Sequence, residues 1–371
     1  MTQHLSHLVI GAGAMGLATT WRLAQRGLAP VALEQFERGH ARGASHGATR
    51  NFNNAYGQPH YLDLLADARR GWDELARVNG EPLLVLHGLV THGDEEKVHL
   101  VHSVLSARGV HAEVWTPGAA SARWPGMRFA TDVLVSNDAG VVRSAAALTA
   151  LEDAARAEGA DVRFGHRVTS IHESSDAVHV IVESADGTSE ITTDTLIVTA
   201  GAWTHRLLGD ALDLPRLTVT EESPAHFAER TVGGRWPSFN HILPRDGDRY
   251  PGNVYGMPTS GEGVKVGFHL VGAVVDPDTR TYTPLPERAD QLRSYVREWF
   301  PGLDPDIGAS ISCTYTSTES EDFVLDRRGR IVVGAGFSGH GFKFTPAVGE
   351  VLARLATDPS AAAAEPFRLL S

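Results

Sequence analysis

The only cysteine of the chain, Cys313, lies in the run Ser-Cys-Thr-Tyr-Thr over residues 312–316. A single cysteine is most often a small packing residue in a core. Its thiolate can also attack an electrophilic carbon when a cationic neighbour stabilises the negative charge. One glycine-rich loop follows over residues 334–343, and another opens the chain at residues 11–16. Because these loops indicate a nucleotide cofactor, we predict that the Cys313 thiol tethers a flavin.

The first glycine loop has the spacing G-x-G-x-x-G. Its glycines are Gly11, Gly13 and Gly16. An apolar strand precedes them, a helix is predicted over residues 14–26, and the next strand ends on Glu34. The glycines permit a tight turn and close approach of a pyrophosphate, which the helix N-terminus attracts. Glu34 is placed to bond both ribose hydroxyls of an adenosine. This motif leaves NAD and FAD open.

Composition excludes several classes of protein. A formal net charge of −12 argues against non-specific binding of nucleic acid or anionic membranes. One cysteine cannot form an intramolecular disulfide, and the 18 histidines are scattered without a metal-binding spacing. No apolar run approaches the roughly 18 residues of a membrane span, and no targeting segment is recognisable. We therefore expect a cytoplasmic protein without a metal.

The predicted elements alternate between nucleotide-binding and strand-rich stretches. Helices are predicted over residues 61–78, 144–158, 288–299 and 346–355, and strands near 162–164, 178–182, 196–198, 219–227, 253–257 and 264–271. The strand at 196–198 runs into a further glycine turn at Gly201. A length of 371 residues favours two domains. The nucleotide-binding parts come from three separate stretches of the chain.

Seven motifs together resemble the monomeric sarcosine oxidase and N-methyltryptophan oxidase family of FAD-dependent amine oxidases. They are G-A-G-A-M-G at 11–16, S-H-G-A-T-R at 45–50, R-W-P-G at 123–126, G-A-W at 201–203, K-V-G-F-H at 265–269, C-T-Y-T at 313–316 and G-F-S-G-H-G-F-K at 336–343. The resemblance implies covalent FAD, oxygen as electron acceptor, a small-molecule amine substrate and a monomer.

The resemblance also predicts the fold class, α/β (α+β) with a discontinuous Rossmann-like FAD-binding domain. That domain would comprise residues 1–84, 142–215 and 320–371. An interleaved substrate domain with a mainly antiparallel β-sheet would comprise residues 85–141 and 216–319.

Several cofactor contacts are implied by the resemblance. Cys313 matches the cysteine that forms a thioether with the flavin, and His46 and Arg50 match residues beside the flavin ring. Backbone N–H groups of the second glycine loop would meet the flavin pyrimidine oxygen, where negative charge accumulates on reduction. The remaining predicted cofactor residues are Ser45, Thr49, Gly201, Gly336, Gly339, Gly341 and Lys343.

Other positions match the family's catalytic and substrate-binding residues. Lys265 matches a lysine that promotes the reaction with oxygen, since a fixed positive charge stabilises superoxide. Lys343 matches a lysine that binds the substrate carboxylate. His269 and Tyr255 match active-site positions. Tyr315 and His340 complete the predicted substrate-binding set, together with Asn53.

The sequence departs from the family at two places. Asn53 occupies the position of an arginine that clamps the substrate carboxylate, and an amide cannot supply the bidentate grip of a guanidinium. Glu221 and Glu222 stand where basic or neutral residues are usual. They are interpreted as a solvated strand end, with attraction of a cationic substrate as the alternative.

The leading hypothesis is an FAD-dependent oxidase of a secondary amine, such as an N-methyl amino acid, that releases hydrogen peroxide. One alternative is oxidation of a cyclic, bulky or sugar-derived amine that lacks the usual carboxylate clamp. An NAD-dependent dehydrogenase, for which Cys313 and Lys265 would be incidental, also remains open. So does a flavin dehydrogenase subunit that works only with a partner chain.

Overall fold

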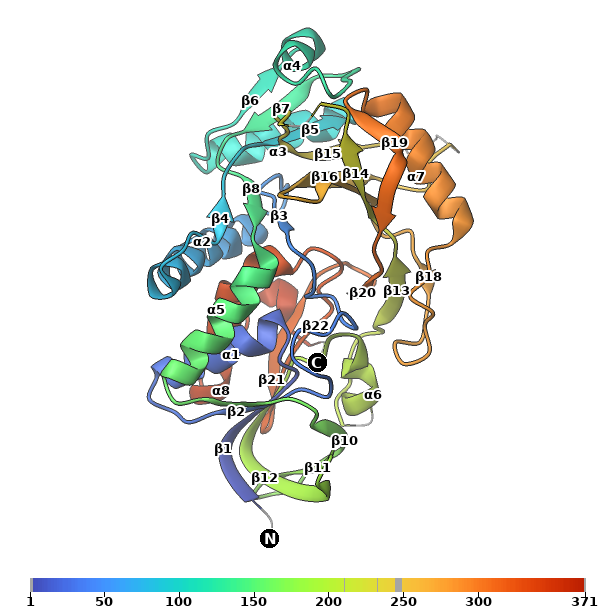
Figure 1. The fold of residues 1–371 in the computed structure, drawn as a ribbon. Helices are drawn as coiled ribbons and strands as arrows, with labels where there is room; N and C mark the ends of the chain where they lie inside the picture. Colours follow the sequence, from blue (N-terminus) through green and yellow to red (C-terminus); the bar gives the residue numbers. More distant parts are fainter. Residues whose placement is uncertain (1–2, 210, 232, 244–248, 370–371) are drawn as a thin grey trace.

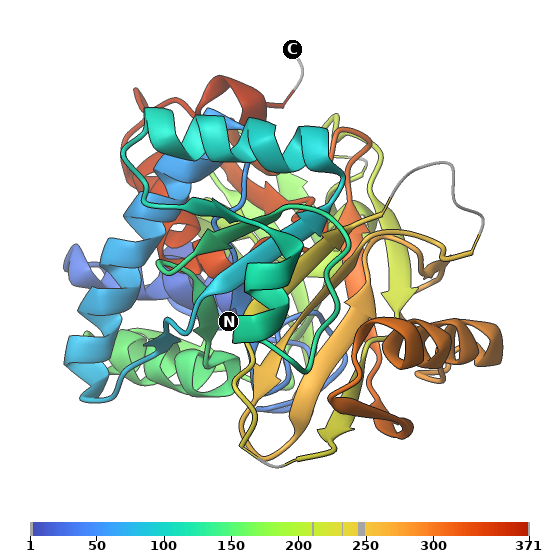
Figure 2. The same ribbon diagram turned by 90° about the horizontal axis from the view of Figure 1, so that it is seen from above.

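Within the residues that the structure describes, the strands form two large β-sheets and two small ones (Figure 1). The computed structural model describes residues 3–209, 211–231, 233–243 and 249–369. Figure 1 shows the second sheet above the first sheet and its helices, and Figure 2 shows the same segments seen from above, with parts from the whole sequence interleaved. The predicted α/β (α+β) class is therefore confirmed, whereas the exact domain boundaries stay a prediction.

The first sheet has a parallel centre. Its order is β10-β11-β12-β1-β2-β9, and β22 joins it between β12 and β21. The bounds are β1 Gln3–Ile10, β2 Val31–Leu33, β9 Asp161–Arg163, β10 Arg167–Glu173, β11 Val178–Ser184, β12 Gly187–Val198, β21 Val324–Arg328 and β22 Ile331–Ala335. β1 pairs in parallel with both β2 and β12, and β12 pairs in parallel with β22. Parallel strands expose their carboxyl ends at one edge, where ligands of such sheets bind.

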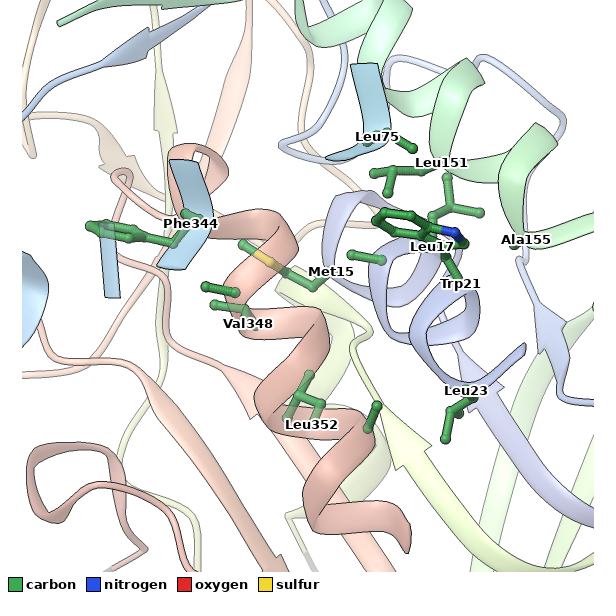
Figure 3. Packing of buried hydrophobic residues seen from close by; sticks show 14 of the residues in the cluster. Met15, Leu17, Trp21, Leu23, Leu75, Leu151, Ala155, Phe344, Val348 and Leu352 are labelled. Atoms are coloured by element: carbon green, nitrogen blue, oxygen red, sulfur yellow. The ribbon is translucent and has the colours of Figure 1, made fainter. Parts of the chain in front are cut away.

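Helices cover this sheet and bury an apolar stripe against one another. They are α1 Ala14–Gln25, α2 Pro59–Asn79, α5 Ser144–Ala157 and α8 Thr345–Thr357. Trp21 and Leu151 pack between α1 and α5, and Val348 and Leu352 line the face of α8 toward the same cluster (Figure 3). Burial of these large side chains stabilises the layer by about 2 kcal/mol for each residue. The helices predicted over 14–26, 61–78, 144–158 and 346–355 are confirmed.

The second sheet is mainly antiparallel, with the order β19-β14-β17-β16-β15-β5-β7-β6. Its strands are β5 Leu89–Gly93, β6 Glu113–Trp115, β7 Val133–Ser136, β14 Ala225–Glu229, β15 Ser238–Ile242, β16 Val254–Thr259, β17 Gly263–Phe268 and β19 Leu303–Ser310. Among its described strands, β5 and β15 pair in parallel and the other neighbours pair antiparallel. The associated helices are α3 Glu95–Ala107, α4 Pro117–Arg123 and α7 Pro286–Trp299. The prediction of an antiparallel sheet, and of a helix at 288–299, is confirmed.

Two three-stranded sheets carry segments of the predicted site. One has the order β3-β8-β4, with β3 Arg50–Phe52, β8 Gly140–Val142 and β4 Leu84–Val85. The other has the order β18-β13-β20, with β18 Ala273–Val274, β13 Thr218–Glu222 and β20 Cys313–Ser317. The short helices are α6 Thr204–Leu208 and the 3₁₀ turns η1 Gly201–Trp203, η2 Phe342–Phe344 and η3 Glu365–Phe367. None of the helices in the described ranges has the length and apolar character needed to cross a membrane.

Candidate active site

One cavity of about 920 Å³ collects most of the residues predicted from the sequence. It extends from the turn after β1, at Gly11, to the start of β20, at Cys313. The second glycine loop, residues 336–343, also lines it. Segments separated by about three hundred residues thus meet in one space, which is large enough for a dinucleotide and a small substrate.

The glycines of the first loop fit the close approach of a pyrophosphate. Gly11 has φ +93°, and a Cβ there would lie 2.5 Å from the Thr199 carbonyl oxygen. A Cβ at Gly16 would lie 1.7 Å from the carbonyl oxygen of Gly11. No side chain fits at either position, so the backbone of α1 begins directly at the cavity wall. This cradle fits the phosphates of FAD at a helix N-terminus.

Glu34 lies at the carboxyl end of β2 and lines the same cavity. Its carboxylate accepts hydrogen bonds from the backbone N–H groups of Ala12 (3.0 Å) and Phe36 (3.1 Å). These bonds hold the side chain against the glycine loop, and each carboxylate oxygen keeps a further acceptor position. The geometry therefore fits the predicted contact with ribose hydroxyls. Gly201, in the turn after β12, lines the cavity on the neighbouring strand.

The segment before β3 is clamped by its own side chains. The Ser45 hydroxyl accepts from the backbone N–H of Ala14, which joins this segment to the first turn of α1 (3.1 Å). The Arg50 guanidinium donates to the carbonyl oxygens of Thr49 (2.9 Å), Ala44 (2.7 Å) and His46. Arg50 thereby holds a positive charge at the cavity wall while it shapes the loop.

Cys313 is partly buried at the start of β20, and its thiol lines the cavity. The Sγ atom lies 3.8 Å from the carbonyl oxygen of Thr314 and 4.0 Å from that of Ala44. His46 Nε2 donates to the carbonyl of Ser312, the residue before the cysteine (3.0 Å). Burial, followed by the positive charge of Arg50, lowers the pKa of His46 to about 4. The neutral imidazole therefore fixes the backbone beside the thiol.

Lys265 projects from β17 toward the same region. The side chain is buried, with 3% exposure, and its ammonium donates to the Thr49 carbonyl oxygen at 3.2 Å. The hydroxyl of Thr49 is in turn 2.7 Å from that of Thr259, at the end of β16. Burial, and then the charge of Arg50, lowers the pKa of Lys265 to about 7. Lys265 is therefore a buried residue of the cavity wall and not a solvated charge on the strand surface.

The second glycine loop follows β22 and turns sharply into α8. Gly339 has φ +74°, and a Cβ there would lie 2.2 Å from the Tyr315 ring. Ser338 has φ +46°, which is uncommon outside glycine, and its backbone N–H donates to the Thr316 carbonyl. The loop is therefore pressed against β20 beside Cys313. Gly336 and Gly341 line the cavity with it.

Lys343 lies at the end of this loop in a closed network. Its ammonium donates to the Tyr56 hydroxyl (2.9 Å) and the His340 carbonyl oxygen (2.7 Å). His340 Nε2 donates to the Glu321 carbonyl (3.2 Å), so its Nδ1 accepts from the Tyr56 hydroxyl (3.1 Å). Burial lowers the pKa of Lys343 to about 7 and that of His340 to about 3. The sequence did not single out Tyr56, which joins both residues.

Three ring side chains form another part of the cavity wall. The Tyr315 hydroxyl donates to the Tyr255 hydroxyl at 3.3 Å. The rings of His269 and Tyr315 have centroids 5.5 Å apart, and His269 meets Tyr255 edge-on. Burial raises the pKa of Tyr255 to about 12 and lowers that of His269 to about 4. All three are therefore neutral at physiological pH and form an aromatic wall with polar tips.

The structure shows which contacts are made by the residues that depart from the family, Asn53, Glu221 and Glu222. Asn53 lines the cavity, but its Oδ1 accepts from the backbone N–H of Ala55 at 2.7 Å, which stabilises the local turn. Glu222 is 1% exposed, so its interpretation as a solvated residue is wrong. Its carboxylate accepts from the backbone N–H groups of Val271 (3.3 Å) and Gly272 (3.0 Å). Glu221 is likewise engaged, by Arg280, and neither glutamate lines the cavity.

Arg280 is a further residue that the sequence did not single out. Its side chain is fully buried and donates to the Glu221 carboxylate (3.0 Å), the Arg42 carbonyl (2.8 Å) and the Ser312 hydroxyl. The guanidinium carbon also lies 3.9 Å from the centre of the Tyr282 ring. Arg280 therefore joins β13, the loop before β3 and the start of β20. No sequence spacing relates these segments, so only their pairing in space reveals the contact.

The parallel sheet and the antiparallel sheet around one cavity form a fold that this chain shares with a solved amino acid oxidase. A solved structure of NikD, described as an unusual amino acid oxidase essential for nikkomycin biosynthesis, has a TM-score of 0.87 with this chain. The two are 25% identical, and the alignment covers 98% of this chain and 96% of that one.

Sequence comparison agrees with the fold. Residues 7–355 match the family described as FAD dependent oxidoreductase. Monomeric sarcosine oxidase from Bacillus sp. (strain B-0618) is 32% identical over 374 residues, or 96% of this chain and 93% of the relative. N-methyl-L-tryptophan oxidase from Yersinia pestis (strain Pestoides F) is 30% identical over 95% of this chain and 94% of the relative. The chain belongs to the FAD dependent oxidoreductases, so the predicted FAD-dependent enzyme is confirmed.

Proposed function

We propose that the chain is an oxidase of a secondary amine, an N-methyl amino acid or a related compound. The amine loses two hydrogens across its C–N bond, and water hydrolyses the resulting imine to an aldehyde and a smaller amine. Bound FAD would supply the acceptor for the two electrons, which oxygen would take up together with two protons to give hydrogen peroxide. The relatives named as sarcosine and N-methyl-L-tryptophan oxidases support this substrate class.

The observation that carries the proposal is the continuity of the cavity. Its nucleotide end holds the glycine cradle and Glu34, and its other end holds Cys313, Lys265 and the second glycine loop. Both lysines of the site, Lys265 and Lys343, line this cavity. We further propose that Cys313 forms a thioether with FAD, and that the protein acts as a cytoplasmic monomer.

Each residue of the site has a separate role in this proposal. Lys265 supplies a buried positive charge where electrons reach oxygen, which is electrostatic stabilisation without proton abstraction. Lys343 offers an ammonium to a substrate anion, and Tyr56 fixes its position. The aromatic wall of Tyr255, Tyr315 and His269 excludes water from the reacting carbon. We propose His340 and Asn53 as further residues at the substrate end of the cavity.

A visible spectrum tests the proposal directly. The purified yellow protein is mixed without oxygen with sarcosine, N-methyltryptophan, proline, pipecolate, glycated amino acids and amines that lack a carboxylate. Bleaching by a secondary amine, followed by return of colour and release of peroxide in air, is the expected result. A protein that none of these amines bleaches, although it holds FAD, would overturn the proposed substrate class.

A cyclic, bulky or sugar-derived amine is the second candidate. It is favoured by Asn53, because a side chain bonded to the backbone N–H of Ala55 cannot replace an arginine fork. Carboxylate recognition then depends on Lys343, which already has two protein acceptors. In the same panel, bleaching only by amines without an α-carboxylate would select this candidate.

A further inference from the structure

Lys265 is a buried cation with little to stabilise its charge. Its ammonium has three N–H donors, and the structure gives it one protein acceptor, the Thr49 carbonyl at 3.2 Å. The nearby positive charge of Arg50, in β3, disfavours the ammonium form of Lys265. The charge of Lys265 in turn lowers the pKa of His46, in the loop before β3. A lysine in such surroundings readily loses its proton.

Two anionic groups oppose this tendency. They are Cys313 of β20, when its thiol is ionised, and Glu262 in the turn between β16 and β17. A thioether carries no charge, so attachment of a flavin to Cys313 would remove one of the two. Glu262 would then be the carboxylate on which the charged form of Lys265 depends. This step rests on the proposed function.

His226 lies next to both Lys265 and Glu262 and so places the carboxylate near the ammonium group. His226 of β14 pairs directly with Lys265 of β17 across the antiparallel ladder, so the two side chains share one face of the sheet. His226 is 8% exposed, and its Nε2 lies 3.2 Å from Glu262 Oε2. Burial of His226, followed by the charge of Lys265, lowers its pKa to about 4, so the ring is neutral where it contacts the carboxylate. Neither residue lines the cavity.

We propose that Glu262, packed against His226, keeps Lys265 in its ammonium form from the same face of the sheet. The Glu262 side chain is 46% exposed, so without the imidazole it would be free to turn into solvent. Both residues act through Lys265 and touch neither substrate nor cofactor. They are positioning residues for the reaction with oxygen.

The composition of the chain allows a direct measurement. It contains only three lysines, Lys97, Lys265 and Lys343. Lysine labelled with ¹³C at the ε carbon would give one NMR signal for each, and Lys265→Arg and Lys343→Arg would assign them. Each signal is followed from pH 6 to 11 in the FAD-loaded protein. Lys97, whose side chain is 44% exposed, serves as the internal reference.

In Glu262→Gln we expect the midpoint of the Lys265 signal to fall by about half to one pH unit, a three- to tenfold change in acidity. His226→Phe should produce a smaller fall, because the carboxylate remains but loses its contact with the imidazole. Unchanged Lys97 and Lys343 midpoints would show that the fold is intact. The matched control is Glu229→Gln, which removes a carboxylate from β14 that accepts from the Gly234 backbone N–H.

A Lys265 midpoint that moves no further in Glu262→Gln than in Glu229→Gln would overturn the proposal. The measurement needs no substrate, so it is independent of the proposed amine. Reoxidation of the reduced flavin by oxygen is measured separately over the same pH range. If the midpoint falls and reoxidation keeps its pH dependence, the assignment of Glu262 stands and the oxygen role of Lys265 fails.

Discussion

At the scale of single residues, the Cys313 thiol offers the sharpest test. It faces the cavity beside the Ala44 carbonyl, and Arg50 supplies a positive charge in the same loop. We expect flavin to stay with the polypeptide after acid precipitation of the unmutated protein. Cys313→Ala should release all of it, because a methyl side chain cannot form a thioether.

The ratio of flavin in pellet and supernatant measures this outcome, and the mass of the intact chain checks it. Ser312→Ala is the matched control, since it alters the neighbouring side chain and leaves the thiol in place. Free flavin in the supernatant of the unmutated protein would contradict covalent attachment. It would leave the assignment of FAD itself unaffected.

At the scale of elements, the junction of β1 and α1 determines whether a cofactor can enter. A Cβ at Gly16 would lie 1.7 Å from the Gly11 carbonyl oxygen, so Gly16→Ala must displace the turn or the helix. We expect this variant to lose most of its bound FAD and about 1–3 kcal/mol of stability. The FAD-to-protein absorbance ratio and the urea midpoint measure both effects.

Gly118→Ala in α4 is the control for this change. A Cβ there meets nothing within 4 Å, so the same added methyl should leave cofactor content unchanged. If Gly16→Ala purifies with a full complement of FAD, close contact between the cofactor and this turn is refuted.

At the scale of the whole molecule, buried histidines make stability depend on pH. Five of the histidines concerned are His46, His226, His241, His269 and His340. Burial lowers the pKa of the first four to about 4 and that of the last to about 3. The unfolded chain regains the ordinary value of 6.5, so between pH 6.5 and 4 it binds more protons than the folded chain. The free energy of unfolding therefore falls as pH falls, by about 1.4 kcal/mol per unit for each histidine that stays neutral.

Urea unfolding at several pH values between 7.5 and 5 measures this slope. His340→Gln should make the slope shallower, because one buried imidazole is removed. His111→Gln, at a side chain that is 75% exposed, provides the comparison. A free energy of unfolding that stays constant down to pH 5 would be inconsistent with neutral buried histidines.

The sequence by itself determined the local motifs and the main helices of this protein. The glycine spacing at 11–16, the strand before it and Glu34 after it are a continuous unit, so periodicity and turn chemistry suffice to predict them. The helices of the first sheet followed from their apolar stripes. Cys313 could be singled out because it is the only cysteine of the chain, and Lys265 because it lies on a predicted apolar strand.

Only the tertiary structure decided which of these residues share an environment. Glu222 reads as a strand-end charge, yet the chain folds it against the backbone of Val271 and Gly272. Arg280 meets Glu221 because β13 pairs with β20 and β18, a contact between distant segments that no local spacing encodes. The physical reason is general: propensity and spacing act between near neighbours in the chain, whereas burial and charge pairing depend on the packing of whole sheets.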